Sequence, residues 1–133
     1  MAECNFIKGN FNETINVLDG IINGSSAKFE KYLPEIRNLL NNIIIKDASN
    51  YRARYYSGKI YNRLKRQRLA LRDFKATVKL NPNHIDAHLE LAKIYRTNGQ
   101  FDLAMEEYET VISIDPNHKE AMDLLREAIT NNN

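Results

Sequence analysis

The 133-residue sequence has one cysteine, no tryptophan and no long apolar run. The single thiol of Cys4 cannot form an intramolecular disulfide, and it suits a reducing compartment. The longest aliphatic run is Ile43 to Ile45, far short of the roughly 20 apolar residues that a membrane-spanning helix needs. The N-terminus also lacks the basic and apolar segments of a secretory signal. We therefore expect no membrane span and an intracellular, cytoplasmic location.

Sequence motifs of catalytic and metal sites are also missing. The chain has no Gly-rich phosphate loop, no HExxH string and no GxSxG string. Cys4 has no histidine close in sequence to activate it, so we expect an inert thiol. His84 and His88 have the i, i+4 spacing of a metal pair, but only Asp86 lies near them in sequence. We therefore expect no enzyme activity, no cofactor and no metal ion.

Charge is unevenly distributed along the chain, although the formal net charge is only +2. Residues 51–84 contain ten basic residues and one acidic residue, whereas residues 85–118 contain two basic residues and seven acidic ones. This asymmetry is a stronger indication of function than the net charge.

An internal repeat runs through the second half of the chain. The sequence Asn81-Pro82-Asn83-His84 is echoed by Asp115-Pro116-Asn117-His118. Small and aromatic residues upstream match in the same register. The matched pairs are Gly58 with Ala92, Tyr61 with Tyr95, Ala70 with Ala104, and Phe74 with Tyr108.

Each repeat predicts two amphipathic helices and a proline that ends the second helix. Apolar side chains recur at three-and-four spacing within residues 85–97, and again within residues 101–112. Gly99 can supply the positive φ that a tight turn between the two helices needs. Pro116 ends the second helix, because proline cannot continue the hydrogen-bond ladder.

Helix caps and turns can also be predicted from this register. We expect Asn83 and Asn117 to cap the helices that follow them, in capping boxes with Asp86 and Glu120. The turn at residues 64–67 contains no glycine. Because a non-glycine residue at positive φ costs roughly 1 kcal/mol, we expect this turn to be longer or differently shaped.

The repeated residues resemble the signature of the tetratricopeptide repeat. It is read at His88, Leu91, Ala92, Tyr95, Ala104, Tyr108 and Pro116 in one copy, and at Arg54, Ser57, Gly58, Tyr61, Ala70, Phe74 and Pro82 in the other. His88 and Arg54 stand where this family usually has tryptophan. The resemblance implies an all-α solenoid of helix-turn-helix units.

We predict a single domain that is divided along these lines. Residues 51–84 and 85–118 form the two repeats, and residues 119–130 form a C-terminal capping helix. Residues 9–50 form a divergent helix pair, whose start at Gly9 to Ile15 resembles the middle of a repeat. Its long helix, Ala27 to Lys46, either starts near Tyr32 or kinks there because of Pro34.

The family resemblance implies a non-catalytic scaffold that binds a protein or peptide on a concave surface lined by the first helix of each repeat. A basic and aromatic end of this groove would favour acidic residues of the partner. By analogy, the partner-binding residues are Arg52, Tyr55, Tyr56, Lys59, Asn62, Arg63, Lys93 and Arg96.

Chaperone-binding members of the family hold the C-terminal carboxylates of their ligand with a clamp of lysine, asparagine and arginine. The clamp positions here are Tyr55, Lys59, Glu90, Glu120 and Leu124. None matches, and two carboxylates would repel the ligand, so we do not expect binding of chaperone tails.

Two other interpretations of the charge pattern remain open. The basic block of one molecule could meet the acidic block of another, in self-association or as a structural segment of a larger solenoid. Nucleic acid or an anionic surface could contact the basic block, but most of that charge falls away from the groove. The residues concerned are Arg63, Lys65, Arg66, Arg68 and Arg72.

Overall fold

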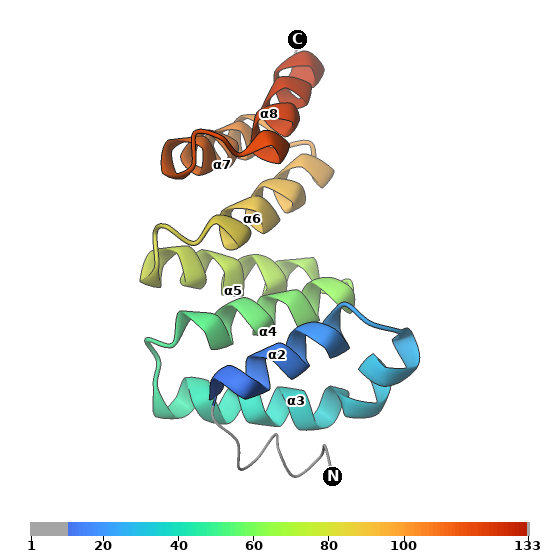
Figure 1. The fold of residues 1–133 in the computed structure, drawn as a ribbon. Coiled ribbons are helices and arrows are strands. Elements are labelled where there is room, and N and C mark those ends of the chain that lie inside the picture. The colour runs from blue at the N-terminus through green and yellow to red at the C-terminus, as the bar shows by residue number, and fades with distance from the viewer. Residues whose placement is uncertain (1–10, 133) are drawn as a thin grey trace.

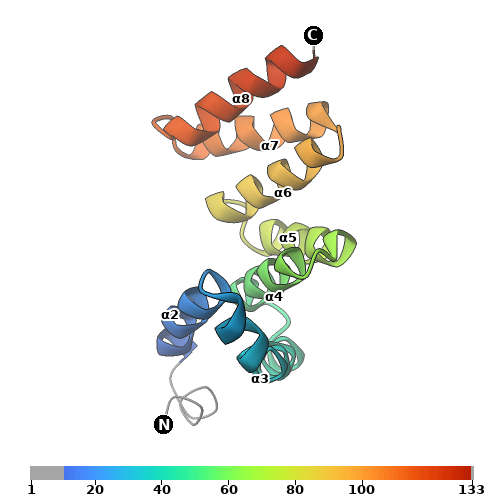
Figure 2. The ribbon, with the colours of Figure 1, turned by 90° about the vertical axis from the view of Figure 1, so that its right-hand side faces the viewer.

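The computed structural model describes residues 11–132 and, within them, seven helices and no strand. The helices are α2 (Phe11–Ile22), α3 (Ser26–Lys46), α4 (Tyr51–Arg63), α5 (Gln67–Leu80), α6 (Ile85–Thr97), α7 (Phe101–Ile114) and α8 (Lys119–Asn132). They follow one another along a stack that runs from α2 and α3 at one end to α8 at the other (Figures 1 and 2). The predicted all-α solenoid is therefore confirmed. Cys4, Gly9 and Asn10 lie outside the described residues.

The two helices of each repeat pack closely because small and aromatic residues alternate at their interface. Ala70 and Phe74 of α5, and Ala104 and Tyr108 of α7, have no exposed surface. A Cβ atom built on Gly58 would lie 2.7 Å from the ring of Phe74. Glycine at this position therefore lets α4 approach α5, as the register of the repeat predicts.

The turn between α4 and α5 corrects the sequence prediction, because it has the same shape as the glycine turn between α6 and α7. Lys65 adopts φ 61°, close to the φ of 76° at Gly99. The hydrogen bonds also match: the amide of Arg66 donates to Tyr61 O at 2.8 Å, as the amide of Gln100 donates to Tyr95 O at 2.8 Å. The packing of the flanking helices therefore holds a lysine in the left-handed region.

The caps of α6 and α8 are histidines and not the predicted asparagines. Nδ1 of His84 accepts a hydrogen bond from the Ala87 amide at 3.1 Å, and Nδ1 of His118 caps α8 in the same way. Asn83 and Asn117 come one residue too early. Their own amides donate to the side chains of the residues two positions before them, in turns that place the histidines at the helix start.

The N-terminal helices α2 and α3 pack on α4 around a separate apolar cluster. Leu18 of α2, Ile36 and Leu40 of α3, and Ile60 of α4 are all at most 2% exposed and belong to it. Helix α3 runs continuously through Pro34, so it does not start at Tyr32. Its first turns run at an angle to the remainder (Figures 1 and 2), which is the predicted kink.

Candidate functional site

The first helices of the repeats, α4 and α6, and the final helix α8 present polar side chains along one side of the stack. We call this the first-helix face. It consists of Arg52, Tyr55, Lys59, Asn62, Asp86, Glu90, Lys93, Arg96, Glu120, Asp123 and Glu127.

Ion pairs connect this face from one first helix to the next. Lys59 Nζ lies 4.0 Å from Glu90 Oε1, which joins α4 to α6. Lys93 Nζ lies 3.6 Å from Glu120 Oε1, which joins α6 to α8. Arg96 Nη2 lies 2.9 Å from Glu127 Oε1 and joins the same two helices. Three of the predicted site residues are therefore paired with acidic residues of their own chain.

Tyr55 forms the aromatic part of the face at its α4 end. Its ring centroid lies 4.7 Å from that of His84 and 5.8 Å from that of Phe74, and Lys59 Nζ lies 5.9 Å from the ring centroid. Burial raises the pKa of the Tyr55 hydroxyl, as do the nearby carboxylates of α6. The hydroxyl is therefore a neutral hydrogen-bonding group. Arg52 and Asn62 of the same helix are exposed.

Two predicted site residues, Tyr56 and Arg63, contact the N-terminal part of the structure, and Tyr56 is buried there. Tyr56 is 6% exposed, and burial together with a hydrogen bond to Asp19 of α2 raises the pKa of its hydroxyl. Arg63 donates to the carbonyl oxygens of Ile22 and, at 3.0 Å, Gly24. It therefore satisfies carbonyls that α2 leaves unpaired at its C-terminus.

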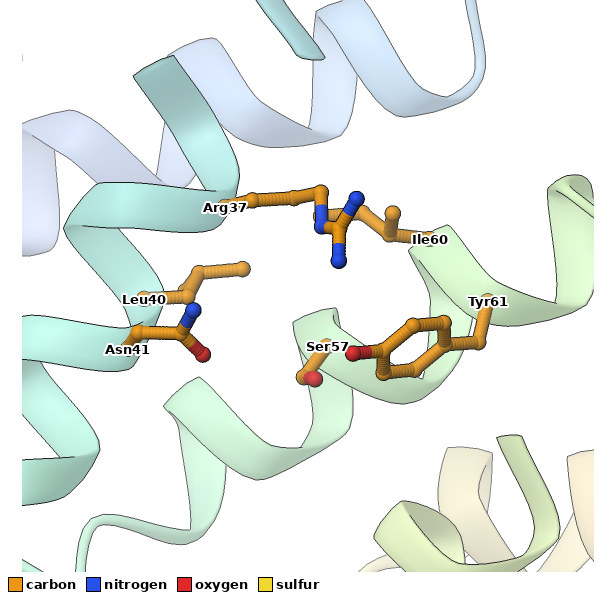
Figure 3. A pocket seen from close by; sticks show the side chains of 6 residues that line it. All are labelled: Arg37, Leu40, Asn41, Ser57, Ile60 and Tyr61. Carbon is orange, nitrogen blue, oxygen red and sulfur yellow. The ribbon is translucent and has the colours of Figure 1, made fainter. Parts of the chain in front are cut away.

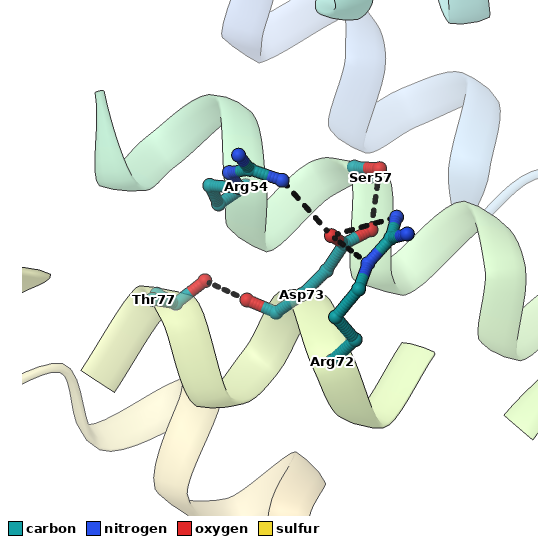
Figure 4. A network of polar contacts seen from close by, with 5 residues as sticks. All are labelled: Arg54, Ser57, Arg72, Asp73 and Thr77. Atoms are coloured by element: carbon teal, nitrogen blue, oxygen red, sulfur yellow. Dashed lines mark hydrogen bonds and ion pairs between the residues drawn. The ribbon is translucent and has the colours of Figure 1, made fainter. Parts of the chain in front are cut away.

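In each repeat, a partly buried polar contact joins the two helices, and we call this contact the clasp. The sequence analysis did not predict it. Asp73 of α5 is 1% exposed and accepts from the Ser57 hydroxyl at 2.6 Å and from Arg54 Nη1 at 3.5 Å (Figure 4). At the equivalent positions of the second repeat, His88 Nδ1 lies 2.6 Å from Glu107 Oε2. The signal in the sequence was the recurrence of a basic and an acidic residue 19 positions apart in both repeats.

The rings of the histidines form hydrogen bonds within the fold. Besides Glu107, the ring of His88 contacts the Pro82 carbonyl oxygen, 2.7 Å from Nε2. The hydrogen bond to Glu107 raises the pKa of His88, whereas burial lowers the pKa of His84. Within residues 11–132, no group of three or more potential metal ligands is close enough together to hold an ion. No helix of this part of the chain has the length and apolar character needed to cross a bilayer.

A small cavity lies between α3 and α4. Its lining includes the polar ends of Arg37, Asn41, Ser57 and Tyr61, which converge on it in Figure 3. Its volume is about 10 Å³. That is room for a single water molecule. We therefore place no ligand there, and the first-helix face is the candidate site.

Comparison with known proteins places the repeats in a family. Residues 68–130 match the sequence profile of the tetratricopeptide repeat, which confirms the resemblance seen in the sequence. No curated protein sequence matches the chain.

Solved structures share the fold at low sequence identity. The first tetratricopeptide domain of Spaghetti (RPAP3), bound to an HSP90 peptide of sequence SRMEEVD, is 23% identical with a TM-score of 0.66, and the match covers 79% of this chain and 87% of that one. A crystal structure of MamA is 22% identical with a TM-score of 0.73, and the match covers 98% of this chain and 77% of that one. A second MamA structure is 21% identical with a TM-score of 0.60, over 96% and 82% of the two chains. These likenesses establish the helical stack.

Proposed function

Because residues 68–130 of this chain belong to the tetratricopeptide repeat family, we propose that the protein is a non-catalytic interaction module that binds a segment of a partner protein on its first-helix face. Repeat proteins of this kind use extended surfaces made of equivalent helices. The α4 end of the face carries Arg52, Lys59 and Tyr55, so it favours acidic residues of the partner.

This proposal depends on the ion pairs across the face, in which a charged group of the partner can replace a side chain of this chain. The Lys93–Glu120 pair has side chains that are 49% and 54% exposed. Such exposed pairs stabilise a fold by only about 0–1 kcal/mol. A partner carboxylate can therefore replace Glu120 on Lys93 at little cost to the stack.

The two ends of the first-helix face also differ in charge. Its α4 end is basic, and the α8 end presents Glu120, Asp123 and Glu127. A bound segment that is acidic at one end and basic at the other would complement both ends, and the opposite orientation would place like charges together. We therefore expect one orientation of the partner.

The test uses fluorescently labelled peptides, one rich in glutamate and one with lysine at the same positions. We expect the glutamate peptide to bind, and we expect the double variant Arg52→Glu, Lys59→Glu to weaken binding about tenfold. The matched control is Lys75→Glu with Lys79→Glu, which makes the same charge change on the exposed side of α5. Equal weakening by both double variants, or equal binding of the two peptides, would contradict the proposal.

The peptide SRMEEVD, seen with the Spaghetti domain, is a second probe. We expect no clamp-like binding of its C-terminal carboxylates, because these need cations at the clamp positions and two of those positions hold Glu90 and Glu120. Fluorescence anisotropy with the same protein checks this, and saturable binding that resists the Arg52→Glu, Lys59→Glu change would show that another surface is used.

A further inference from the structure

The second helices α3, α5 and α7 expose residues at equivalent positions whose charges differ from one repeat to the next. On α5 these positions form the α5 basic stripe, Arg68, Arg72, Lys75 and Lys79. At the equivalent positions of the next repeat, on α7, they form the α7 acidic stripe, Asp102, Glu106 and Glu109, followed by Ser113. One repeat earlier, on α3, they are the uncharged residues Pro34, Asn38, Asn41 and Ile45. All of these side chains are exposed.

The two charged stripes have the same spacing. Their members follow at intervals of four and then three residues, so each stripe lies along one side of its helix. With a rise of about 1.5 Å per residue, the second and third charges of each stripe lie about 6 Å and about 10 Å along the helix axis from the first charge. Helix α6 lies between α5 and α7 in the stack (Figure 1). The stripes therefore occupy equivalent, neighbouring positions on the outside of one molecule.

We propose that the α5 basic stripe and the α7 acidic stripe are two halves of a self-complementary surface through which two copies of this chain form a dimer. The two-fold axis of this dimer runs parallel to the helices and lies in the interface, midway between α5 and α7. Rotation about it brings α5 of each copy against α7 of the other. The cations Arg68, Arg72 and Lys75 then meet the anions Asp102, Glu106 and Glu109 of the other copy, and Lys79 meets Ser113. Each pairing is made twice, as two-fold symmetry requires.

The surroundings of the acidic stripe can accommodate long basic side chains. Glu106 and Glu109 border an open depression of about 560 Å³ between α7 and Pro82. Leu80 and Leu103, which follow the stripe residues Lys79 and Asp102 in sequence, are 40% and 38% exposed and would add apolar contact area at the edge of the surface. The surface therefore offers both charge complementarity and burial of apolar groups.

A second copy fits these observations better than nucleic acid does. A polyanion that follows the α5 basic stripe along the stack would meet the carboxylates of Glu106 and Glu109 one repeat later. The uncharged positions on α3 extend no basic surface in the other direction. Alternation of sign between neighbouring repeats is the pattern that a dimer requires.

Exchange of charge between the stripes tests the proposal. One variant carries Arg68→Glu, Lys75→Glu and Lys79→Glu, and leaves Arg72 because it also contacts the buried Asp73 at 3.3 Å. A second variant carries Glu106→Lys and Glu109→Lys. Sedimentation velocity of the full chain at up to about 0.5 mM protein measures dimer formation. Far-UV circular dichroism checks that each variant remains helical.

We expect the wild-type chain to dimerise, with a Kd that rises about tenfold between roughly 0.05 M and 0.5 M NaCl. Each variant alone should be monomeric at low salt, because four of the six charge pairings in its dimer join like charges, against two of six in a dimer of the two variants. An equimolar mixture of the two variants should form a heterodimer. The control Lys28→Glu, Lys46→Glu and Lys119→Glu, which changes exposed cations outside the stripes, should dimerise like the wild type.

A wild-type chain that stays monomeric, a dimer that survives either variant, or folded variants that fail to form a heterodimer would each overturn the proposal. Retention of a monomeric wild-type chain on heparin, lost only in the α5 variant, would overturn it in favour of a polyanion partner. The dimer leaves the first-helix face uncovered, so peptide binding there succeeds or fails independently.

Discussion

Replacement of Lys65 by glycine should stabilise the protein, although it removes a side chain and a charge. Lys65 has φ 61° in a turn that is hydrogen-bonded like the turn at Gly99. A residue with a side chain pays roughly 1–2 kcal/mol in the left-handed region. Glycine itself lowers the free energy of unfolding by about 0.5–1 kcal/mol, because it has greater conformational freedom in the unfolded chain. The free energy of unfolding should therefore rise by about 0.5–1 kcal/mol, and Tm by roughly 2–4 °C.

Urea unfolding followed by circular dichroism measures this change, and two controls isolate its cause. Lys65→Gln removes the charge but keeps the Cβ atom, so it should leave the stability unchanged within about 0.5 kcal/mol. Gly99→Lys creates the same strain in the next repeat, where a Cβ atom meets nothing within 4 Å, so it should lower the stability by about the amount that Lys65→Gly gains. If Lys65→Gln stabilises as much as Lys65→Gly, charge repulsion and not backbone strain is responsible.

Three further changes test the packing and the clasps. Gly58→Ala should destabilise the protein by about 1–3 kcal/mol in urea unfolding, because its Cβ would lie 2.7 Å from the ring of Phe74. Asp73→Ala should cost about 2 kcal/mol, because it removes the carboxylate acceptor at the centre of the clasp; no change would mean that the clasp is not formed in solution. The pKa of His88 is raised above its ordinary value of 6.5 by Glu107, so its stabilising contribution is complete below about pH 6.5 and disappears as the pH rises through the folded-state pKa. Glu107→Gln should therefore destabilise the protein more at about pH 5.5 than at about pH 8.5, and an NMR titration should show a lowered pKa of His88.

The helices and their packing faces could be predicted because burial follows residue spacing. Ala70 and Phe74 recur as Ala104 and Tyr108, and all four are fully buried. One periodicity therefore fixed which side of each helix packs inward. The prediction was strongest where the apolar side chains recur in the next repeat, and it was less detailed for α2 and α3, whose sequences depart from the pattern.

The turn and the caps could not be predicted in the same way, because neighbouring structure decides them. The turn at Lys65 follows the geometry of the helices on either side, and their packing outweighs a strain of about 1 kcal/mol. At the start of α6, both Asn83 and His84 can offer an acceptor to a backbone amide. The side chain of Asn81 engages the Asn83 amide at 3.3 Å, and this turn leaves His84 at the capping position.

The candidate site shows the same limit for charged and aromatic side chains. The family resemblance placed Lys59, Lys93 and Arg96 on one face, but it did not show that they pair with glutamates of the next first helix. It also placed Tyr56 and Arg63 on α4 without showing that α2 packs against them. A single helix determines the direction of a side chain, whereas the stack of helices determines its partner. On the proposed binding surface, the charges that remain exchangeable after the helices have packed are therefore the exposed ion pairs between α6 and α8.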